Sequence, residues 1–309
     1  MKKIAISIGD LNGIGIQLAL ENHDTIKNIV EPLYCIDEVM LEKASKLLNL
    51  PIPSDFICVK KIAKSFSIRP SEVTKESGVY SFASFLKAVE LVKMGDVDGI
   101  MTLPIHKKAW ELAGVDFKGH TDALREFFFA PAIMMLGSPK MYVALYTEHI
   151  PLHQVPEEIK DVQKLSQFLI DFYESIEEDL KENEPIGLLG LNPHAGDDGV
   201  LGNEEQYIEE ARAIAHKTIG KELYTKPLVP DVAFTPNSRK NYRYFVAMYH
   251  DQGLAPLKAL YFDEGINISL NLPIIRTSVD HGTAFDIAYK NKKLNNLSYI
   301  NALNYFVTT

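Results

Sequence analysis

Short, nearly continuous apolar runs alternate along the chain with longer segments in which apolar residues recur every three or four positions. Residues 4–8 and 32–36 are such runs, whereas residues 78–94 have the spacing of a helix. Continuous apolar strands are typical of parallel sheets that are covered on both faces. The alternation of strand and helix therefore predicts an α/β fold built from βαβ units.

The same patterning places the remaining elements. Further strands are predicted at residues 55–59, 97–102, 133–136, 142–146, 187–192, 246–249 and 265–270. Further helices are predicted at residues 38–48, 156–184 and 203–219, and a terminal helical region is expected to open at residues 280–283. The short segment 137–141, which contains Gly137-Ser138-Pro139, separates the strands at 133–136 and 142–146, and this predicts an antiparallel pair.

Composition narrows the class of protein. The contents of 46% hydrophobic and 24% charged residues are ordinary for a globular enzyme. The net charge of −9 and the lack of a basic stripe argue against nucleic-acid binding. No apolar run approaches the ~18 residues of a membrane span, so we expect no membrane association. Cys35 and Cys58 form no CxxC motif, which favours unpaired thiols in a reducing cytoplasm.

The first predicted strand leads into a glycine-rich segment at residues 9–15, Gly-Asp-Leu-Asn-Gly-Ile-Gly. Backbone N–H groups of such a turn at the start of a helix can hold an anion. The segment is neither GxGxxG nor a P-loop, because it lacks the glycine spacing of the first and the Gly-Lys-Ser/Thr of the second. Two interpretations stay open: a polar contact to a substrate, or a tight turn that lets the strand and helix pack.

The stretch at residues 246–253, Val-Ala-Met-Tyr-His-Asp-Gln-Gly, is a strong candidate for chemistry. An apolar strand presents His250, Asp251 and Gln252 at its end, and Gly253 is expected to turn the backbone away. An imidazole, a carboxylate and an amide side by side at the end of a buried strand favour a functional site over a packing role.

Two more histidines, His149 and His194, also follow apolar strands. Together with His250 they could supply three neutral nitrogen ligands to one divalent metal with an open coordination position. No two of them have the HxxxH spacing of a helical zinc site, so hydrogen-bonded structural histidines are the alternative. The histidines without a surrounding motif, which are expected at the surface, are His23, His153 and His216.

A second group of polar residues is suited to binding an anion. Gly119-His120-Thr121 is typical of a helix N-terminus, where Thr121 would be the N-cap and free amides would favour a phosphate. His120 as a surface residue that caps the turn is the alternative. Arg276 at a strand end could pair with a carboxylate or phosphate through its planar fork. The other cationic and amide candidates for substrate recognition are Lys107, Lys258 and Asn267, and Asp231 is expected to face the same site.

Five motifs occur along the chain: Pro104-Ile-His-Lys107, Gly119-His-Thr121, Gly190-Leu-Asn-Pro-His-Ala-Gly196, Ala247-Met-Tyr-His-Asp-Gln-Gly253 and Leu272-Pro-Ile-Ile-Arg-Thr-Ser-Val-Asp-His-Gly-Thr-Ala284. With them the chain resembles the 4-hydroxythreonine-4-phosphate dehydrogenase family over essentially its whole length. Enzymes of this family oxidise the C3 hydroxyl of 4-phosphooxy-L-threonine with NAD(P) in pyridoxal 5'-phosphate (vitamin B6) biosynthesis. The resulting β-keto acid loses carbon dioxide and gives 3-amino-2-oxopropyl phosphate.

The resemblance implies roles for individual residues. It places one divalent metal ion, zinc, cobalt or magnesium, on His149, His194 and His250. It places substrate contacts on His120, Thr121, Lys258, Asn267 and Arg276. The wider group of related dehydrogenases implies that NAD(P) lies at Asp280, His281, Gly282 and Thr283. The resemblance also implies a homodimer whose active site takes residues from both chains.

The fold that the resemblance implies has two α/β domains with mixed, mostly parallel sheets and a cleft between them, as in isopropylmalate dehydrogenase. Length alone allows two domains or one large one. We predict a first domain of residues 1–115 and 285–309, and a second of residues 116–284 with the metal histidines and the dimer interface. The chain departs from the family pattern, which has Pro, Pro, Glu and Gly, at Leu11, Ile16, Gln17 and Leu103.

The resulting hypothesis is a metal-assisted hydride transfer followed by decarboxylation. The metal would lower the pKa of the substrate hydroxyl, and the nicotinamide would take the hydride. The candidate catalytic residues are His250, Asp251, Asp231 and Lys258. The main alternative is a metal-dependent lyase or hydrolase of a phosphorylated metabolite that uses no nicotinamide. A non-enzymatic binding module is disfavoured by the many polar motifs at strand ends, and no aspartate cluster of the isopropylmalate dehydrogenase type replaces the histidines.

Overall fold

The computed structural model describes residues 1–308 and contains two compact units. The first unit comprises Met1–Ala130, Ile266–Ile268 and the residues from Leu272 onward. The second comprises Pro131–Gly265 and Ser269–Asn271. Both units combine helices with mostly parallel strands, which confirms the predicted α/β class.

The first unit has the strand order β2-β1-β3-β9-β8. Its strands are β1 (Lys3–Ser7), β2 (Glu31–Cys35), β3 (Gly99–Thr102), β8 (Ile266–Leu270, whose last two residues group with the second unit) and β9 (Ile275–Val279). Its helices are α1 (Gly15–Ile26), α2 (Glu38–Leu48), α3 (Lys75–Lys93), α4 (Lys107–Leu112), α5 (His120–Phe128) and α11 (Leu297–Thr308). Strand β1 pairs in parallel with β2 and β3, and β3 pairs in parallel with β9.

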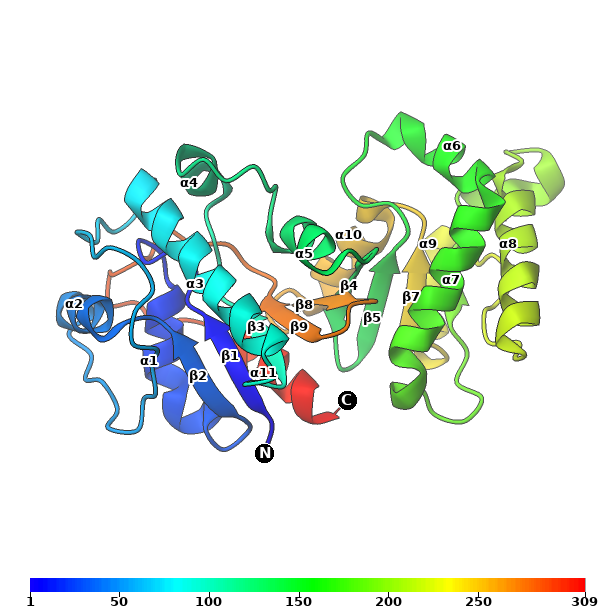
Figure 1. Ribbon diagram of the computed structural model, residues 1–309. Helices are drawn as coiled ribbons and strands as arrows, with labels where there is room; N and C mark the ends of the chain where they lie inside the picture. Colours follow the sequence, from blue (N-terminus) through cyan, green and yellow to red (C-terminus); the bar gives the residue numbers. More distant parts are fainter. Residues whose placement is uncertain (309) are drawn as a thin grey trace. The chain divides into compact units, whose positions relative to one another are not determined.

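Helices cover both faces of this sheet, with α3 on one face and α1 and α11 on the other (Figure 1). The four residues of β3 are all buried, as the continuous apolar run predicts. Under α3 the core is aromatic, because Trp110 and Phe85 pack on each other and on Ala123 and Leu124 of α5. This packing fixes the start of α5, where two candidate substrate residues lie.

The second unit has the strand order β4-β5-β7-β6. Its strands are β4 (Ile133–Ser138), β5 (Met141–Leu145), β6 (Gly187–Leu188) and β7 (Tyr244–Ala247). Its helices are α6 (Val155–Lys160), α7 (Val162–Ile176), α8 (Glu204–Ile219), α9 (Pro230–Ala233) and α10 (His250–Tyr261). The predicted antiparallel pair is confirmed as β4 and β5, and β7 pairs in parallel with β5 and β6.

Alternation along the strands of the second unit divides its core between two helices. Helix α10 packs on the face that presents Val143 and Ala247. Tyr244 points to the opposite face, where its ring lies against Phe172 of α7. Gly253 was expected to turn the chain after β7, but it lies inside α10, where an added Cβ would stand 2.5 Å from Val143 Cγ1. This glycine therefore serves close packing of helix on sheet.

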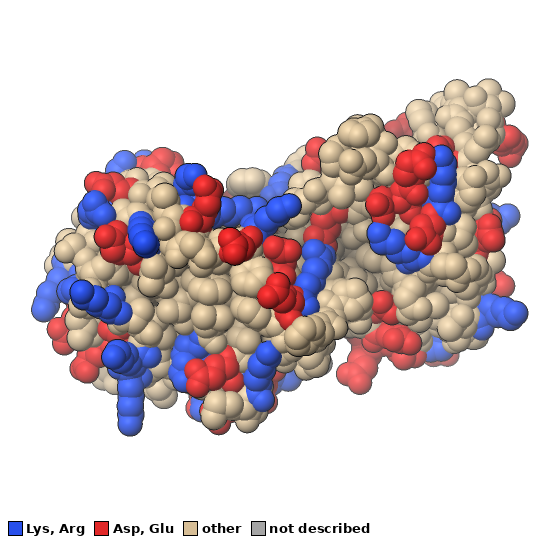
Figure 2. Space-filling model, turned by 45° about the horizontal axis from the view of Figure 1, so that its top comes forward, with Lys and Arg blue, Asp and Glu red and all other residues tan. Residues whose placement is uncertain are grey.

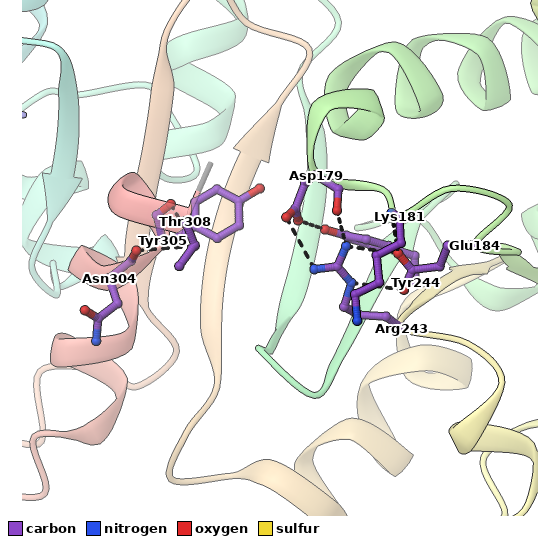
Figure 3. A network of polar contacts seen from close by, with 8 residues as sticks. All are labelled: Asp179, Lys181, Glu184, Arg243, Tyr244, Asn304, Tyr305 and Thr308. Atoms are coloured by element: carbon purple, nitrogen blue, oxygen red, sulfur yellow. Dashed lines mark hydrogen bonds and ion pairs between the residues drawn. The ribbon is translucent and has the colours of Figure 1, made fainter.

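A polar network holds the segment between α7 and β6 against the start of β7 (Figure 3). The Arg243 guanidinium donates to Glu184 at 3.2 and 3.1 Å and to Asp179 Oδ1 at 3.3 Å. The Tyr244 hydroxyl donates to the other oxygen of Asp179. Charge-assisted bonds of this kind are stronger than neutral ones, so they anchor the entry to the strand that leads to His250.

Three predicted elements differ from the structure. The predicted strand at 55–59 is reduced to one bridge between Tyr34 and Cys58. The single helix predicted at 156–184 is broken at Asp161, whose carboxylate accepts from the Lys164 backbone N–H and caps α7. The terminal helical region does not open at 280–283, because α11 begins only at Leu297. The apolar pattern showed where these segments are buried, and local capping decided where the helices begin.

The two compact units have bounds that differ from the predicted domains. Residues 116–130 and 272–284, assigned to the second domain from the sequence, group with the first unit. Strand β9 is hydrogen-bonded to β3, and α5 packs on the aromatic core beneath α3. The sequence pattern did not reveal these contacts, because they join strands and helices that are far apart in the sequence.

The structure also bears on the predictions made for surface charge, membrane association, the cysteines and His23. Basic and acidic side chains are interspersed on the face drawn in Figure 2. No helix of residues 1–308 combines the length and apolar character that crossing a membrane requires. Cys35 and Cys58 are both free thiols, as predicted. His23, expected at the surface, is instead buried, with its Nδ1 3.0 Å from the Tyr34 hydroxyl and its Nε2 3.2 Å from Asp55.

Candidate functional site

A pocket of about 260 Å³ opens at the ends of β5 and β7 in the second unit. Parallel strands end at the same edge of a sheet, so the segments that follow them lie together. The residues that line the pocket come from the segments after the two strands. They are Thr147, Glu148, His149, Ile150, Leu152, Val155, Tyr249, His250 and Asp251. Two of the three predicted metal ligands therefore share one pocket.

His149 and His250 lie with ring centroids 5.9 Å apart. Their side chains are 56% and 39% exposed, so solvent reaches both rings. His250 Nδ1 lies 2.7 Å from Asp251 Oδ1, which favours the tautomer with a proton on Nδ1. A histidine held in this way presents its Nε2 lone pair, the usual arrangement of a metal ligand whose other nitrogen donates to a carboxylate.

His194 lies on a different structure, the turn Pro193–Gly199 that follows β6. Its side chain is exposed, and its backbone is left-handed, with φ of 54°. Within residues 1–308 of one chain, no three His, Cys, Asp or Glu side chains stand close enough to form a metal site. The structure therefore joins His149 and His250 but does not add His194 to them.

Three other candidates of this unit occupy distinct positions. Gln252 is structural, because its amide accepts from the Met248 N–H at 2.7 Å and donates to the Gly190 carbonyl at 2.6 Å. Asp231 is exposed on α9 and does not line the pocket. Lys258 is half-buried on α10, two turns after His250. The amide in the strand-end motif thus ties α10 to the end of β6.

The first unit gathers the candidate anion-binding residues. Arg276 on β9 is 3% exposed, and its guanidinium donates to Thr102 Oγ1 at 2.6 Å and to Asn267 Oδ1 at 3.3 Å. Burial lowers the pKa of Arg276 to about 9, which still leaves the side chain charged at neutral pH. The strand order places its neighbours, since β9 pairs with β3, which ends at Thr102. The result is a buried positive charge held in a fixed orientation.

His120 lies beside this charge at the first residue of α5. Burial lowers the pKa of His120 well below its usual value, and the positive charge of Arg276 adds to the effect. The imidazole is therefore neutral, and its buried Nε2 makes no hydrogen bond to the described residues. The N-cap of α5 is Gly119 rather than the predicted Thr121, which lies inside the helix at its second position.

The segment proposed for the cofactor, residues 280–283, packs on the first glycine-rich loop. The Ile14 N–H donates to the Thr283 carbonyl at 3.1 Å, and a Cβ on Gly13 would lie 2.8 Å from the same oxygen. Burial lowers the pKa of His281, and its Nδ1 lies 3.1 Å from the Gly282 carbonyl. Phe285, which lies two residues after this segment, stacks on His106 with ring centroids 5.1 Å apart. The close approach at Gly13 supports the interpretation of the glycine-rich segment as a tight turn needed for packing, and a contact to substrate stays a prediction.

The metal implied by the family resemblance can be tested against these residues. His149 and His250 offer two imidazoles in one pocket, and Asp251 orients one of them. Neutral imidazoles are ligands that zinc and cobalt favour. The chemistry and exposure of this pair fit a divalent cation. Because residues 1–308 of one chain form no group of three His, Cys, Asp or Glu side chains that could hold a metal, any further ligand would have to come from another source.

Sequence reasoning missed three residues near the two clusters. Thr102 holds Arg276, and Glu148 and Tyr249 line the histidine pocket. Each directly adjoins a strand end or a named histidine. Their positions were thus available in the sequence, but nothing in the residue type distinguished them from surface polar residues.

The chain was compared with known proteins. Residues 28–306 match the model of the family described as pyridoxal phosphate biosynthetic protein PdxA. A 4-hydroxythreonine-4-phosphate dehydrogenase from Sulfurimonas denitrificans is 56% identical over 301 residues, covering 97% of this chain and 95% of the relative.

Solved structures give the same picture. A 4-hydroxythreonine-4-phosphate dehydrogenase from Klebsiella pneumoniae superposes with a TM-score of 0.82 at 30% identity, covering 99% of this chain and 97% of that one. A β-decarboxylating dehydrogenase from Thermococcus kodakarensis has a TM-score of 0.51 at 11% identity, covering 99% of this chain and 82% of that one. The second likeness shows the fold alone, and it confirms the predicted dehydrogenase-like fold class.

Proposed function

Because the chain belongs to the PdxA family of pyridoxal phosphate biosynthetic proteins, we propose that it is an NAD(P)-dependent 4-hydroxythreonine-4-phosphate dehydrogenase. The observation that supports this most strongly is 56% identity to a relative of that name over nearly the whole chain. The substrate is 4-phosphooxy-L-threonine, and the product after decarboxylation is 3-amino-2-oxopropyl phosphate, an intermediate of pyridoxal 5'-phosphate biosynthesis.

The reaction has two steps, an oxidation and a decarboxylation. The C3–H bond breaks with transfer of hydride to NAD(P)⁺, and the C3 hydroxyl loses its proton, which leaves a ketone. The bond between C2 and the carboxylate then breaks, carbon dioxide leaves, and the electron pair becomes an enolate that takes up a proton at C2. The protein must therefore bind a dianionic phosphate and a carboxylate, and it must stabilise negative charge as it develops on the C3 oxygen.

The first-unit cluster is suited to the phosphate. The buried guanidinium of Arg276, the neutral imidazole of His120 and the backbone N–H groups at the start of α5 can all donate hydrogen bonds. Thr121 in the first turn of α5 adds a hydroxyl, and Asn267 holds one side of the guanidinium. Lys258 is the further substrate contact that we propose in the second unit.

The second-unit pocket is suited to a divalent cation, and we propose that His149, His194 and His250 hold it. A cation held there would supply Lewis-acid chemistry toward the substrate, and a nicotinamide held by residues 280–283 would supply the hydride acceptor. Asp251 orients the His250 ring through its 2.7 Å contact. The proton from the substrate hydroxyl is taken by a carboxylate or by water, and Asp251 and Asp231 are the candidate carboxylates.

We also propose a homodimer with a shared active site. The support is that one chain brings together only two of the three histidines. A second copy related by two-fold symmetry can add the missing ligand to each site. The free thiols of Cys35 and Cys58 support a reducing compartment, so we place the enzyme in the cytoplasm.

Absorbance at 340 nm tests this function against the alternative. The purified protein, supplied with a divalent cation, 4-phosphooxy-L-threonine and either NAD⁺ or NADP⁺, should form reduced nicotinamide and one carbon dioxide per turnover. The lyase or hydrolase alternative predicts substrate loss at the same rate with no nicotinamide added. Release of inorganic phosphate or of another product without a signal at 340 nm would exclude the dehydrogenase assignment.

A further inference from the structure

The turn that presents His194 has an unusual backbone. Five consecutive residues, His194–Asp198, are left-handed, with φ of 54°, 52°, 83°, 44° and 54°. Only Gly196 among them is a glycine, and left-handed geometry is unfavourable for every residue that carries a Cβ. A run of this kind persists only where surrounding contacts hold it.

Glu205, the second residue of α8, holds the two residues that lead into this run. Its Oε1 accepts from the backbone N–H groups of Leu191 at 2.9 Å and Asn192 at 2.7 Å. Its Oε2 accepts from Asn192 Nδ2 at 2.9 Å. One carboxylate thus receives three hydrogen bonds from the two residues that precede Pro193 and His194. A carboxylate in the first turn of a helix is also favoured by the helix dipole.

The turn closes tightly around this carboxylate. A Cβ on Gly196 would lie 2.6 Å from Glu205 Oε2, and a Cβ on Gly190 would lie 3.2 Å from Oε1. At the other end, a Cβ on Gly202 would lie 2.3 Å from Asn192 Nδ2. The Leu201 N–H closes the loop on the Gly196 carbonyl at 3.0 Å. The glycines leave room for Glu205 and Asn192 at the centre of the loop.

We propose that Glu205 is a positioning residue that fixes the direction of the His194 imidazole by holding residues 191–198 in this left-handed turn. The proposal rests on the proposed function, in which His194 is a metal ligand. Glu205 does not touch the cation or the substrate. It acts by keeping His194 in the one orientation that can meet the ligands of a shared site, so its loss weakens cation binding more than it weakens the fold.

Cobalt binding to the full-length protein tests the proposal. The affinity for Co²⁺ is measured by competition with a chromophoric chelator, and the visible Co²⁺ spectrum reports the coordination. Glu205→Gln places an amide N–H against Asn192 Nδ2, so two donors face each other. We expect about 10–100-fold weaker Co²⁺ binding, the loss typical of groups that orient a metal ligand. The matched control is Glu210→Gln, which makes the same change at an exposed site of the same helix and should bind like the wild type.

Amide hydrogen exchange supplies a readout that needs no metal. In Glu205→Gln the backbone N–H groups of Leu191 and Asn192 should exchange faster, while exchange in the strands β5 and β7 stays as in the wild type. Should Glu205→Gln fail to fold, Asn192→Ser decides the question, because it removes the amide that donates to Glu205 and to Glu204 and leaves the bonds of Glu205 to the backbone. It should weaken Co²⁺ binding in the same direction by a smaller factor.

His194→Ala separates the two ways of failing. If His194→Ala binds Co²⁺ as tightly as the wild type, His194 is not a ligand, and the metal assignment of the proposed function fails together with this inference. If His194→Ala loses the cation but Glu205→Gln binds it within twofold of the wild type, the metal assignment stands and the positioning role of Glu205 is wrong.

Discussion

Arg276 combines a positive charge with near-complete burial, and this is the residue-scale feature on which the proposed substrate recognition depends. Its planar fork reaches two oxygens at once, on Thr102 and Asn267. A lysine carries the same charge but cannot reproduce a fork. The orientation of the charge, rather than its presence, is therefore what Arg276 adds.

Replacing Arg276 with lysine tests that statement. We expect Arg276→Lys to raise the KM for 4-phosphooxy-L-threonine about 10–100-fold, the equivalent of one charged hydrogen bond, and to change the KM for the nicotinamide little. Arg69→Lys is the control, because Arg69 is half-exposed and pairs with Glu72 and Glu76 at the surface. An unchanged KM in Arg276→Lys would remove Arg276 from the phosphate site.

Asp10 is a second buried charge, in the glycine-rich loop after β1. Burial raises its pKa from 3.8 to about 6, although it accepts from the Asn12 N–H at 2.9 Å and the Ser77 hydroxyl at 3.0 Å. The folded-state pKa lies above the unfolded one. Its favourable contribution is therefore complete below pH 3.8 and is lost as the pH rises through about 6. At neutral pH the buried charge costs about 3 kcal/mol.

Asp10→Asn removes this charge and keeps a side chain that can bond to both partners. The difference in free energy of unfolding between variant and wild type should grow in favour of the variant between about pH 4 and about pH 6, and then level off near about 3 kcal/mol. Urea unfolding at several pH values measures it. A difference that does not depend on pH would show that Asp10 titrates with an ordinary pKa.

At the scale of elements, α10 is the helix that carries His250 and Lys258. Its contact with the sheet depends on Gly253, where a Cβ would stand 2.5 Å from Val143 Cγ1 and 3.0 Å from Ala247 Cβ. An exposed glycine inside a helix loses about 1 kcal/mol relative to alanine. At Gly253 the helix propensity favours alanine, but a Cβ would collide with the sheet. We expect the steric cost to exceed the gain in helix propensity.

We therefore expect Gly253→Ala to lower the free energy of unfolding by about 1–3 kcal/mol and to reduce metal affinity, because α10 must move away from β5. Chemical denaturation and Co²⁺ titration measure the two effects. Ala259→Gly on the exposed side of α10 is the control for helix propensity, and it should lower stability without changing metal affinity. A stabilised Gly253→Ala would contradict the packing described here.

Periodicity in the sequence identified most elements because burial determines it directly. Helix α2 was predicted with its observed bounds, and β1, β2 and α8 within a residue or two. The prediction failed where a segment does not have the backbone hydrogen bonds that its apolar pattern suggests. Residues 55–59 are apolar enough for a strand but make only one bridge, and Asp161 interrupts an amphipathic pattern that continues on both sides of it.

At the scale of the whole molecule, each unit gathers some of the candidate site residues: Arg276 and His120 in the first, and His149 and His250 in the second. The sequence could assign residues to a site through motifs, and it could place them at strand ends. It could not show that His149 and His250 share a pocket while His194 stands outside any three-residue group, since that depends on loop geometry such as the left-handed turn at His194. The role of Gln252 was hidden for the same reason.

A shared site makes a prediction about mixed dimers. His149→Ala, His194→Ala and His250→Ala chains are co-expressed in pairs with different affinity tags, and each heterodimer is isolated. If two ligands come from one chain and one from its partner, two of the three pairings retain one intact site and about half of the wild-type activity. If all three ligands come from one chain, every pairing stays inactive.

In the proposed site, three histidines hold one cation against the alcohol that is oxidised. A crystal structure with Co²⁺ and 4-phosphooxy-L-threonine tests it most directly. We predict nitrogens of His149, His194 and His250 at about 2.0–2.1 Å from one cation, the substrate C3 oxygen on the same cation, and the phosphate at Arg276 and the start of α5. Cobalt bound without these histidines, or histidines that stay apart in every chain and across every dimer contact, would contradict the account.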